Sequence, residues 1–436
     1  MKKIIPVYFT IIFLLLGFVL SSCGLSDGRD EGKNRDSLTV FYFPSVQNSA
    51  KVKIVESIFK DFGINIDYYS VDNSDEFLEY VSPEFVQKLS ADIMAGKGPD
   101  IFLFDFNGSF ADLNKKMDAG VFYDINDFIN ADNSFNLNDY ERRIMDAGIY
   151  KGKRYILPVS YHVPMLISTK EKFDKYGYKI DDFTRFNSFL SGWEAFLNER
   201  DSLFVDPYLL WMSLSTTHYG FLDECVDYEK NEVNLKTPTL KRVMDILRND
   251  YLNSEFYPNS VSYIGSKDSL FNFSETISNS LDMIKDYGWD NAVIIPVPNA
   301  FGNSTASIMD YCMISKNCKN PDLAWTYVKI LLSCKIQNTS VLSNEAFYNG
   351  IGVMKGSMDQ IIEDWFDKYS IEIGKNKEAK DMISGVYNSY DNVVLPFFKG
   401  YSVVIQMVDY IENSSMNDFD KLKAETENYF NIWLSE

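Results

Sequence analysis

Histidine and cysteine are scarce in this chain, and their scarcity argues against several kinds of catalytic site. The 436 residues include two histidines, His162 and His218, and five cysteines. Neither histidine stands in a recognisable metal-binding or nucleophile-activating spacing, and the sequence has no HExxH, GxSxG or phosphate-binding loop. A retaining glycosidase needs two carboxylates roughly 5 Å apart, and no pair stands out among the many acidic residues. We therefore expect a protein that is not an enzyme and that uses no metal or cofactor.

The cysteines fit no zinc-binding pattern, and none lies in a CxxC motif. Four of them follow Cys23 in the chain: Cys225, Cys312, Cys318 and Cys334. Apolar neighbours predict that Cys312 and Cys334 are small core residues. The even number permits disulfides, and the sequence leaves open whether any of the four forms one.

Basic residues are fewer than acidic ones: the chain has 42 Lys and Arg and 62 Asp and Glu, which gives a formal net charge of −20. A phosphate backbone would be repelled by such a surface, so we expect no nucleic-acid partner. Apolar residues make up 46% of the chain and allow a large core, which at this length favours two lobes. The 33 Phe, 28 Tyr and 6 Trp fill that core and also suit stacking on the apolar faces of sugars.

The N-terminal segment has the features of a targeting signal. Lys2 and Lys3 precede an almost wholly apolar run from Ile4 to Leu20, and two serines then lead to Cys23. This pattern resembles a bacterial lipoprotein signal, which implies removal of residues 1–22 and a lipid on Cys23. The alternative is an uncleaved anchor, but the run is slightly short of the ~20 residues that span a bilayer. Residues 23–37 are polar and read as a flexible tether.

The stretch from Ser82 to Ser109 predicts one complete unit of an α/β sheet. Ser82 and Pro83 suit the start of a helix, Gly96 suits the left-handed position after its end, and Pro99 stops it. The apolar run at residues 101–104 then predicts a strand buried on both faces, and it ends in polar residues. Ligands of such sheets lie beyond the carboxyl ends of the strands, so Asp105 and Asn107 are candidate ligand-binding residues.

The preceding residues extend this pattern. Apolar runs predict strands at residues 38–43 and 64–69, with a helix between them whose apolar face includes Val52 and Val55. Alternation of strand and helix favours a parallel, doubly wound sheet. The loop after the first strand then lies on the same edge as Asp105, which makes Gln47 a further candidate for contact with a ligand.

Four segments together resemble the extracellular solute-binding proteins of ABC transporters, in the group that takes up sugars. They are AGKGPDIFLFD at residues 95–105, YKGKRYILPV at 150–159, WDNAVIIPVP at 289–298 and SKNCKNPDLAW at 315–325. Two places depart from the family pattern. Ser168 and Thr169 replace the usual Tyr-Asn, and the segment from Gly350 to Val353 replaces Gly-x-Leu-Pro.

The resemblance implies an α/β, two-lobed fold of the periplasmic-binding-protein type II, with a mostly parallel sheet flanked by helices in each lobe. Strands near Val159 and Cys312 would be the hinge. We expect lobe 1 to comprise residues 38–159 plus 313–356, and lobe 2 residues 161–311 plus 357–436. Family members place aromatic and polar groups at the crossings and before the second-lobe strand, which adds Tyr161, Trp289 and Tyr311 to the candidate ligand-binding residues.

The function implied is a monomeric, lipid-anchored receptor on the outer face of the cell membrane. It would bind a carbohydrate, with an oligosaccharide favoured, between the lobes and deliver it to ABC permease subunits. Two alternatives stay open: a surface glycoside hydrolase or lyase, and a receptor for a non-carbohydrate solute such as a polyamine. The sequence identifies neither the sugar nor a partner such as a sensor kinase.

Overall fold

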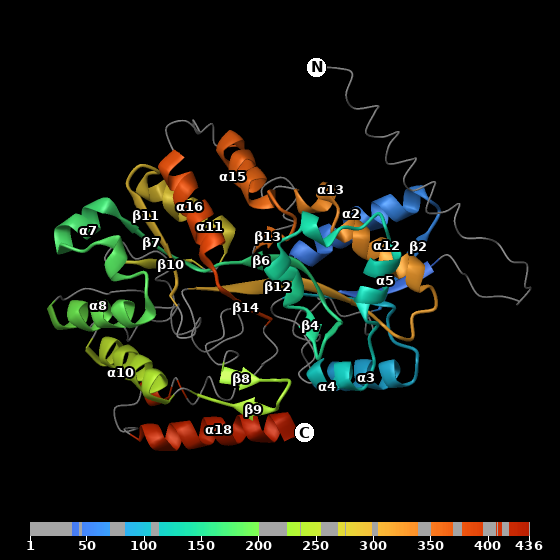
Figure 1. Cartoon of the computed structure of the whole chain (residues 1–436), viewed down its shortest axis with the longest axis horizontal. Helices are drawn as coiled ribbons and strands as arrows, with labels where there is room; N and C mark the ends of the chain where they lie inside the picture. Colours follow the sequence, from blue (N-terminus) through green and yellow to red (C-terminus); the bar gives the residue numbers. More distant parts are fainter. Residues whose placement is uncertain are drawn as a thin grey trace, which may run out of the picture. The chain divides into compact units, whose positions relative to one another are not determined.

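The computed structural model describes residues 37–42, 46–69, 83–105, 113–199, 225–235, 237–253, 269–274, 276–298, 304–338, 350–368, 377–395, 407, 409–411 and 418–435 (Figure 1). The expected signal, the tether with Cys23, the candidate residue Asn107 and His218 lie outside these residues. Among the helices described, none is both long and apolar enough to cross a membrane.

Strands and helices alternate along the chain. The strands are β1 (Ser37–Tyr42), β2 (Asn65–Tyr68), β3 (Ile101–Asp105), β4 (Ile149–Tyr150), β5 (Lys153–Arg154), β6 (Leu157–His162), β7 (Met165–Thr169), β8 (Val226–Asp227), β9 (Glu232–Val233), β10 (Asn272–Ser274), β11 (Ala292–Pro296), β12 (Thr305–Ile314), β13 (Ile351–Gly352) and β14 (Asn392–Val394). The α-helices are α2 (Val46–Asp61), α3 (Pro83–Met94), α4 (Leu113–Asp118), α5 (Ile125–Ala131), α6 (Arg142–Asp146), α7 (Lys170–Tyr176), α8 (Phe186–Glu199), α10 (Thr237–Asn253), α11 (Ile277–Tyr287), α12 (Pro321–Leu331), α13 (Cys334–Gln337), α15 (Ser357–Lys368), α16 (Lys377–Ser389) and α18 (Phe419–Ser435). Two short 3-10 helices cover Leu137–Asp139 and Ile180–Asp182.

The predicted helix, turn and strand unit is confirmed by α3 and β3. Gly96 adopts the left-handed conformation with a φ of 68°. At Gly98 a Cβ atom would stand 2.8 Å from Cγ1 of Ile93, so the turn packs too closely for a side chain. Asp100 then accepts a hydrogen bond from the backbone N–H of Thr39, 2.9 Å long, which ties the turn to β1.

A seven-stranded sheet contains this unit. Its order is β13, β6, β12, β3, β1, β2, and β14 pairs with β12 off this path. Strand β1 lies between β2 and β3 and is parallel to both, which confirms the parallel arrangement expected for the first three strands. The carboxyl ends of β1 and β3 therefore meet at one edge of the sheet.

The chain passes from this sheet to a second one after β6 and returns to it at β12. Strand β6 leads through Val163 and Pro164 into β7 of a three-stranded sheet, and β11 of that sheet leads back to β12. Strands β6 and β12 lie side by side and antiparallel (Figure 1). All ten residues of β12 are buried.

The relative direction of the strands differs from what we expected. We expected mostly parallel strands in each lobe, but the first sheet is mixed, since β12 is antiparallel to both β3 and β6. In the second sheet, β7 pairs antiparallel with both β10 and β11. The topology gives the reason: β7 carries the chain away from the first sheet and β11 carries it back, so as neighbours they run in opposite directions.

Buried apolar residues form two clusters. The first surrounds the seven-stranded sheet and also includes residues of α11, α15 and α16. The second joins α8, α10 and α18 to one face of the three-stranded sheet. Trp193 of α8 is completely buried in the second cluster.

Helix α12 shows how the SKNCKNPDLAW segment builds the fold. Its apolar stripe, which includes Ala324 and Val328, is buried. On its other side, Asp132 accepts a hydrogen bond of 2.8 Å from Nε1 of Trp325 and pairs with Nζ of Lys329 at 2.7 Å. Burial by itself would raise the pKa of Asp132, but hydrogen bonds from Lys329, Ser134 and Trp325 outweigh it and hold that pKa well below its ordinary value.

Candidate functional site

Strand β12 changes partners along its length, and the change marks the centre of the candidate site. Its first residues, from Thr305 to Ser307, pair with β14, while Asp310 to Ile314 pair with β3. The register with β6 shifts on both sides of Asp310. Such irregularities bend a strand and re-aim its side chains, so β12 is irregular at Asp310, where its pairing with β3 begins.

Asp310 is held by two groups from other elements. Nζ of Lys51, on α2, lies 2.5 Å from the Asp310 carboxylate, with 0% and 5% of the two side chains exposed. The hydroxyl of Ser160, on β6, donates a hydrogen bond to the same carboxylate oxygen. One buried ion pair therefore joins α2 to both crossing strands.

This cluster adjoins two of the predicted ligand-binding residues. Asp105 ends β3 and is the cross-strand partner of Asp310. Gln47 lies one helical turn before Lys51 on α2. Helix α2 begins at Val46, so Gln47 belongs to the first turn of a helix and not to the loop that we expected. The structure describes the backbone positions of Gln47 and Asp105, and their role in binding stays a prediction.

The third predicted residue near the crossings, Tyr161, lies in an aromatic group. Its ring is 5.9 Å from that of Tyr387 and 6.0 Å from that of Tyr390. The neighbouring His162 is completely buried, and its Nδ1 lies 2.6 Å from the hydroxyl of Tyr387. Burial raises the pKa values of Tyr161 and Tyr387 far above the ordinary tyrosine value, so both phenols stay neutral.

Trp289 and Tyr311 are both buried in the first cluster. Trp289 packs edge-on against Phe366 at 4.6 Å and against Trp365 at 5.3 Å. Its Nε1 has no hydrogen-bond partner among the described residues. Tyr311 packs on Phe104 at 5.6 Å, on the strand pair that ends beside Asp105. Of the predicted aromatic residues, Tyr311 and Tyr161 thus belong to the crossing strands, and Trp289 lies in the turn between α11 and β11.

Lys51, Ser160 and Asp310 are not among the residues predicted from the sequence. The signal for Asp310 was present, because a carboxylate interrupts an otherwise apolar strand, and a buried charge needs a partner. Its partner could not be found from the sequence, since Lys51 lies 259 positions away.

The described cysteines form no disulfide, and the described acidic residues form no metal-binding group. Cys225, Cys312, Cys318 and Cys334 are free thiols, so the disulfide that the sequence left open does not join Cys312 to Cys318. Burial raises the pKa of the Cys312 and Cys318 thiols to about 12. Cys334 is exposed and not in the core as expected, because it begins the short helix α13 and turns to solvent. Within the described ranges, no group of three or more His, Cys, Asp or Glu could hold a metal ion.

The sequence of the chain matches the profile of a known protein family. The profile of the bacterial extracellular solute-binding proteins matches residues 76–357. A search of the curated proteins found no match.

Solved structures resemble the whole chain at low sequence identity. An ABC substrate-binding protein from Listeria monocytogenes, in complex with cycloalternan, has a TM-score of 0.57 and 14% identity, over 92% of this chain and 99% of that chain. The sugar-binding protein MalE from Xanthomonas citri has a TM-score of 0.60 and 12% identity, over 92% and 97%. A cyclic alpha-maltosyl-1,6-maltose binding protein from Arthrobacter globiformis has a TM-score of 0.57 and 15% identity, over 91% and 98%.

These likenesses confirm the α/β, two-lobed fold of the periplasmic solute-binding proteins that the sequence led us to expect. The family and these neighbours are binding proteins and not enzymes. With the family profile covering well over half of its length, the chain belongs to the bacterial extracellular solute-binding proteins.

Proposed function

We propose that this protein is the substrate-binding component of an ABC importer, and that it binds an oligosaccharide between its two lobes. The observation that carries the proposal is the pair of crossing strands. Strands β6 and β12 connect the two sheets side by side, and β3 ends in Asp105 next to the return crossing. A solute that touched this edge and the second lobe together would favour their closure.

The chemistry of the edge suits a sugar. Carbohydrate hydroxyls need hydrogen-bond partners, and the side-chain oxygens of Gln47, Asp105 and Asn107 are the acceptors that we propose for them. Tyrosine and tryptophan rings suit the apolar faces of sugar rings. A net charge of −20 disfavours an anionic ligand. Structural neighbours were solved with or named for cycloalternan, maltotetraose and raffinose, which are neutral oligosaccharides.

A calorimetric titration of the full chain tests the proposal. Maltotetraose, raffinose and cycloalternan are the sugar probes, and spermidine represents the non-carbohydrate alternative. We expect at least one of the sugars to bind with a 1:1 stoichiometry. Binding of spermidine alone, or release of shorter sugars from a polysaccharide, would favour one of the two alternative functions instead.

A matched pair of variants locates the site. Asp105→Ala removes a carboxylate at the proposed edge, and Asp61→Ala removes an exposed one at the far end of α2. Losing a charged hydrogen-bond partner costs about 1.5–3 kcal/mol, so Asp105→Ala should weaken sugar binding roughly 10- to 100-fold. Asp61→Ala should leave the affinity unchanged. Equal affinities of the two variants for the sugar would show that the Asp105 side chain does not contribute to binding.

We further propose that Cys23 carries a lipid that anchors the protein to the cell membrane on its outer face. Metabolic labelling with radioactive palmitate should mark the wild-type chain and leave Cys23→Ala unlabelled. Label retained in Cys23→Ala would show that the anchor is elsewhere.

A further inference from the structure

Two hairpins that belong to different apolar clusters meet away from the crossing strands. The first joins β4 to β5, and its Tyr150 is part of the first cluster. The second joins β8 to β9, and its Val226 is part of the second cluster. Tyr228, in the turn of the second hairpin, packs against both clusters.

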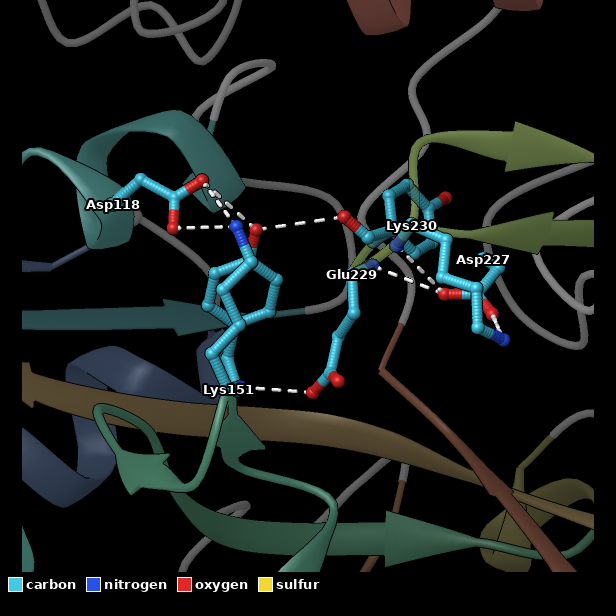
Figure 2. A network of polar contacts seen from close by, with 7 residues as sticks. Asp118, Lys151, Asp227, Glu229 and Lys230 are labelled. Atoms are coloured by element: carbon cyan, nitrogen blue, oxygen red, sulfur yellow. Dashed lines mark hydrogen bonds and ion pairs between the residues drawn. The ribbon is translucent and has the colours of Figure 1, made fainter.

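Polar contacts connect the two turns (Figure 2). The backbone N–H of Lys151 donates a hydrogen bond of 2.8 Å to the carboxylate of Glu229. On the other side, Asp118 at the end of α4 accepts from Nζ of Lys151 at 2.9 Å and from the hydroxyl of Tyr150 at 3.1 Å. Asp118 thus fixes the first turn, and Glu229 links it to the second.

The C-terminal helix adds a third connection between the same two regions. Nζ of Lys115, on α4, donates to the backbone carbonyl of Trp433, on α18, at 3.2 Å. The Trp433 ring packs edge-on against Tyr228, with 5.6 Å between ring centroids. The contact between the hairpins is therefore continuous with a contact between α4 and α18.

The first turn holds its donor in a fixed direction. Lys151 and Gly152 both adopt left-handed backbone conformations, with φ of 48° and 77°. This is the geometry of a tight two-residue hairpin turn, in which a residue other than glycine is rare. The N–H of Lys151 is free of the β4–β5 ladder and points to Glu229.

We propose that this contact, formed by Asp118, Tyr150, Lys151, Tyr228 and Glu229 and called here the hairpin latch, determines ligand affinity without touching the ligand. The latch joins a hairpin of expected lobe 1 to a hairpin of expected lobe 2, a contact additional to the crossing strands. It therefore stabilises the arrangement in which it forms, which we take to be the arrangement that binds the solute. Apparent affinity scales with the fraction of molecules in the binding-competent arrangement. This inference rests on the proposed function, because the latch acts on the affinity for the solute.

The test compares two alanine variants of one hairpin. Glu229→Ala removes the acceptor of the latch, and Glu232→Ala makes the same chemical change three residues away, at an exposed side chain. A hydrogen bond of this kind contributes enough to change a two-state equilibrium roughly two- to ten-fold. We expect Glu229→Ala to weaken binding of maltotetraose or raffinose by that factor, mainly through faster dissociation, and Glu232→Ala to bind as wild type.

A ligand-free measurement separates this inference from the proposed function. Spin labels at Asn133→Cys and Asn249→Cys, two exposed positions, report the distance between the turn after α5 and α10 in a background of Cys23→Ser and Cys334→Ser. Electron-electron double resonance should give a broader distance distribution for Glu229→Ala than for Glu232→Ala. If that difference appears and none of the sugar probes binds, the result supports the hairpin latch as a restraint on the lobe arrangement and contradicts the proposed function. Equal distributions, or a broadened one with unchanged affinity, would overturn the inference.

Discussion

The buried ion pair between Lys51 and Asp310 offers the sharpest test of how the crossing strands are held. Lys51→Met keeps a long side chain on α2 but removes its charge. The Asp310 carboxylate, with 5% of its side chain exposed, would then lose its cationic partner inside the protein. The hydrogen bond from Ser160 remains.

The expected cost follows from that burial. Removing one partner of a buried ion pair destabilises a protein by about 3–5 kcal/mol, because the other charge is left buried. Replacing both partners with apolar residues of similar size is often close to neutral. Lys51→Met should therefore be severely destabilising, and the double variant Lys51→Met/Asp310→Leu should recover most of the loss.

Guanidinium denaturation followed by tryptophan fluorescence measures the effect. Lys241→Met is the matched control, since Lys241 pairs with Asp245 on the surface of α10, with 52% and 41% of the side chains exposed. Exposed pairs contribute about 0–1 kcal/mol, so this variant should unfold close to wild type. If Lys51→Met unfolds at the same denaturant concentration as Lys241→Met, the ion pair does not hold the crossing strands.

Three further predictions concern stability. Gly98→Ala should lower the free energy of unfolding by about 1–3 kcal/mol, because its Cβ would crowd α3. Gly385→Ala should raise the free energy of unfolding by about 0.5–1 kcal/mol, since this glycine lies inside α16 with open space beside it. Thermal unfolding of both variants checks that one is less stable and the other more stable than wild type. The lowered pKa of Asp132 means that its contribution is fully present above its ordinary pKa of 3.8 and is lost as the pH falls below it. Asp132→Asn should therefore be less stable than wild type at pH 7, and the difference should shrink on acidification below pH 3.8; a constant difference would contradict this reasoning.

Local signals predicted the first part of the fold well. The stop of α3, the left-handed Gly96 and the apolar strand β3 follow from residues adjacent in the sequence, and the structure confirms them. The two crossings were also predictable, because family motifs flank both of them. The direction of the strands in the second sheet was not predictable, since short strands such as β10 and β11 carry no signal for their pairing partner.

The candidate site was less predictable than the fold. Position at a strand end identified Asp105, and the structure adds that Asp310 is its cross-strand neighbour. Periodicity does not reveal which face of a strand carries a ring, so the burial of Tyr311 against Phe104 needed coordinates. The pair of Lys51 and Asp310 and the hairpin latch depend on contacts between distant segments, which no local pattern encodes.

Small-angle X-ray scattering of the full chain, with and without a saturating oligosaccharide from the titration panel, tests the central claim most directly. If the sugar bridges two lobes that are joined by β6 and β12, the radius of gyration should fall when it binds, and Asp105→Ala should need more sugar to reach the same compaction. Tight binding with an unchanged radius of gyration would contradict closure of the lobes around the solute.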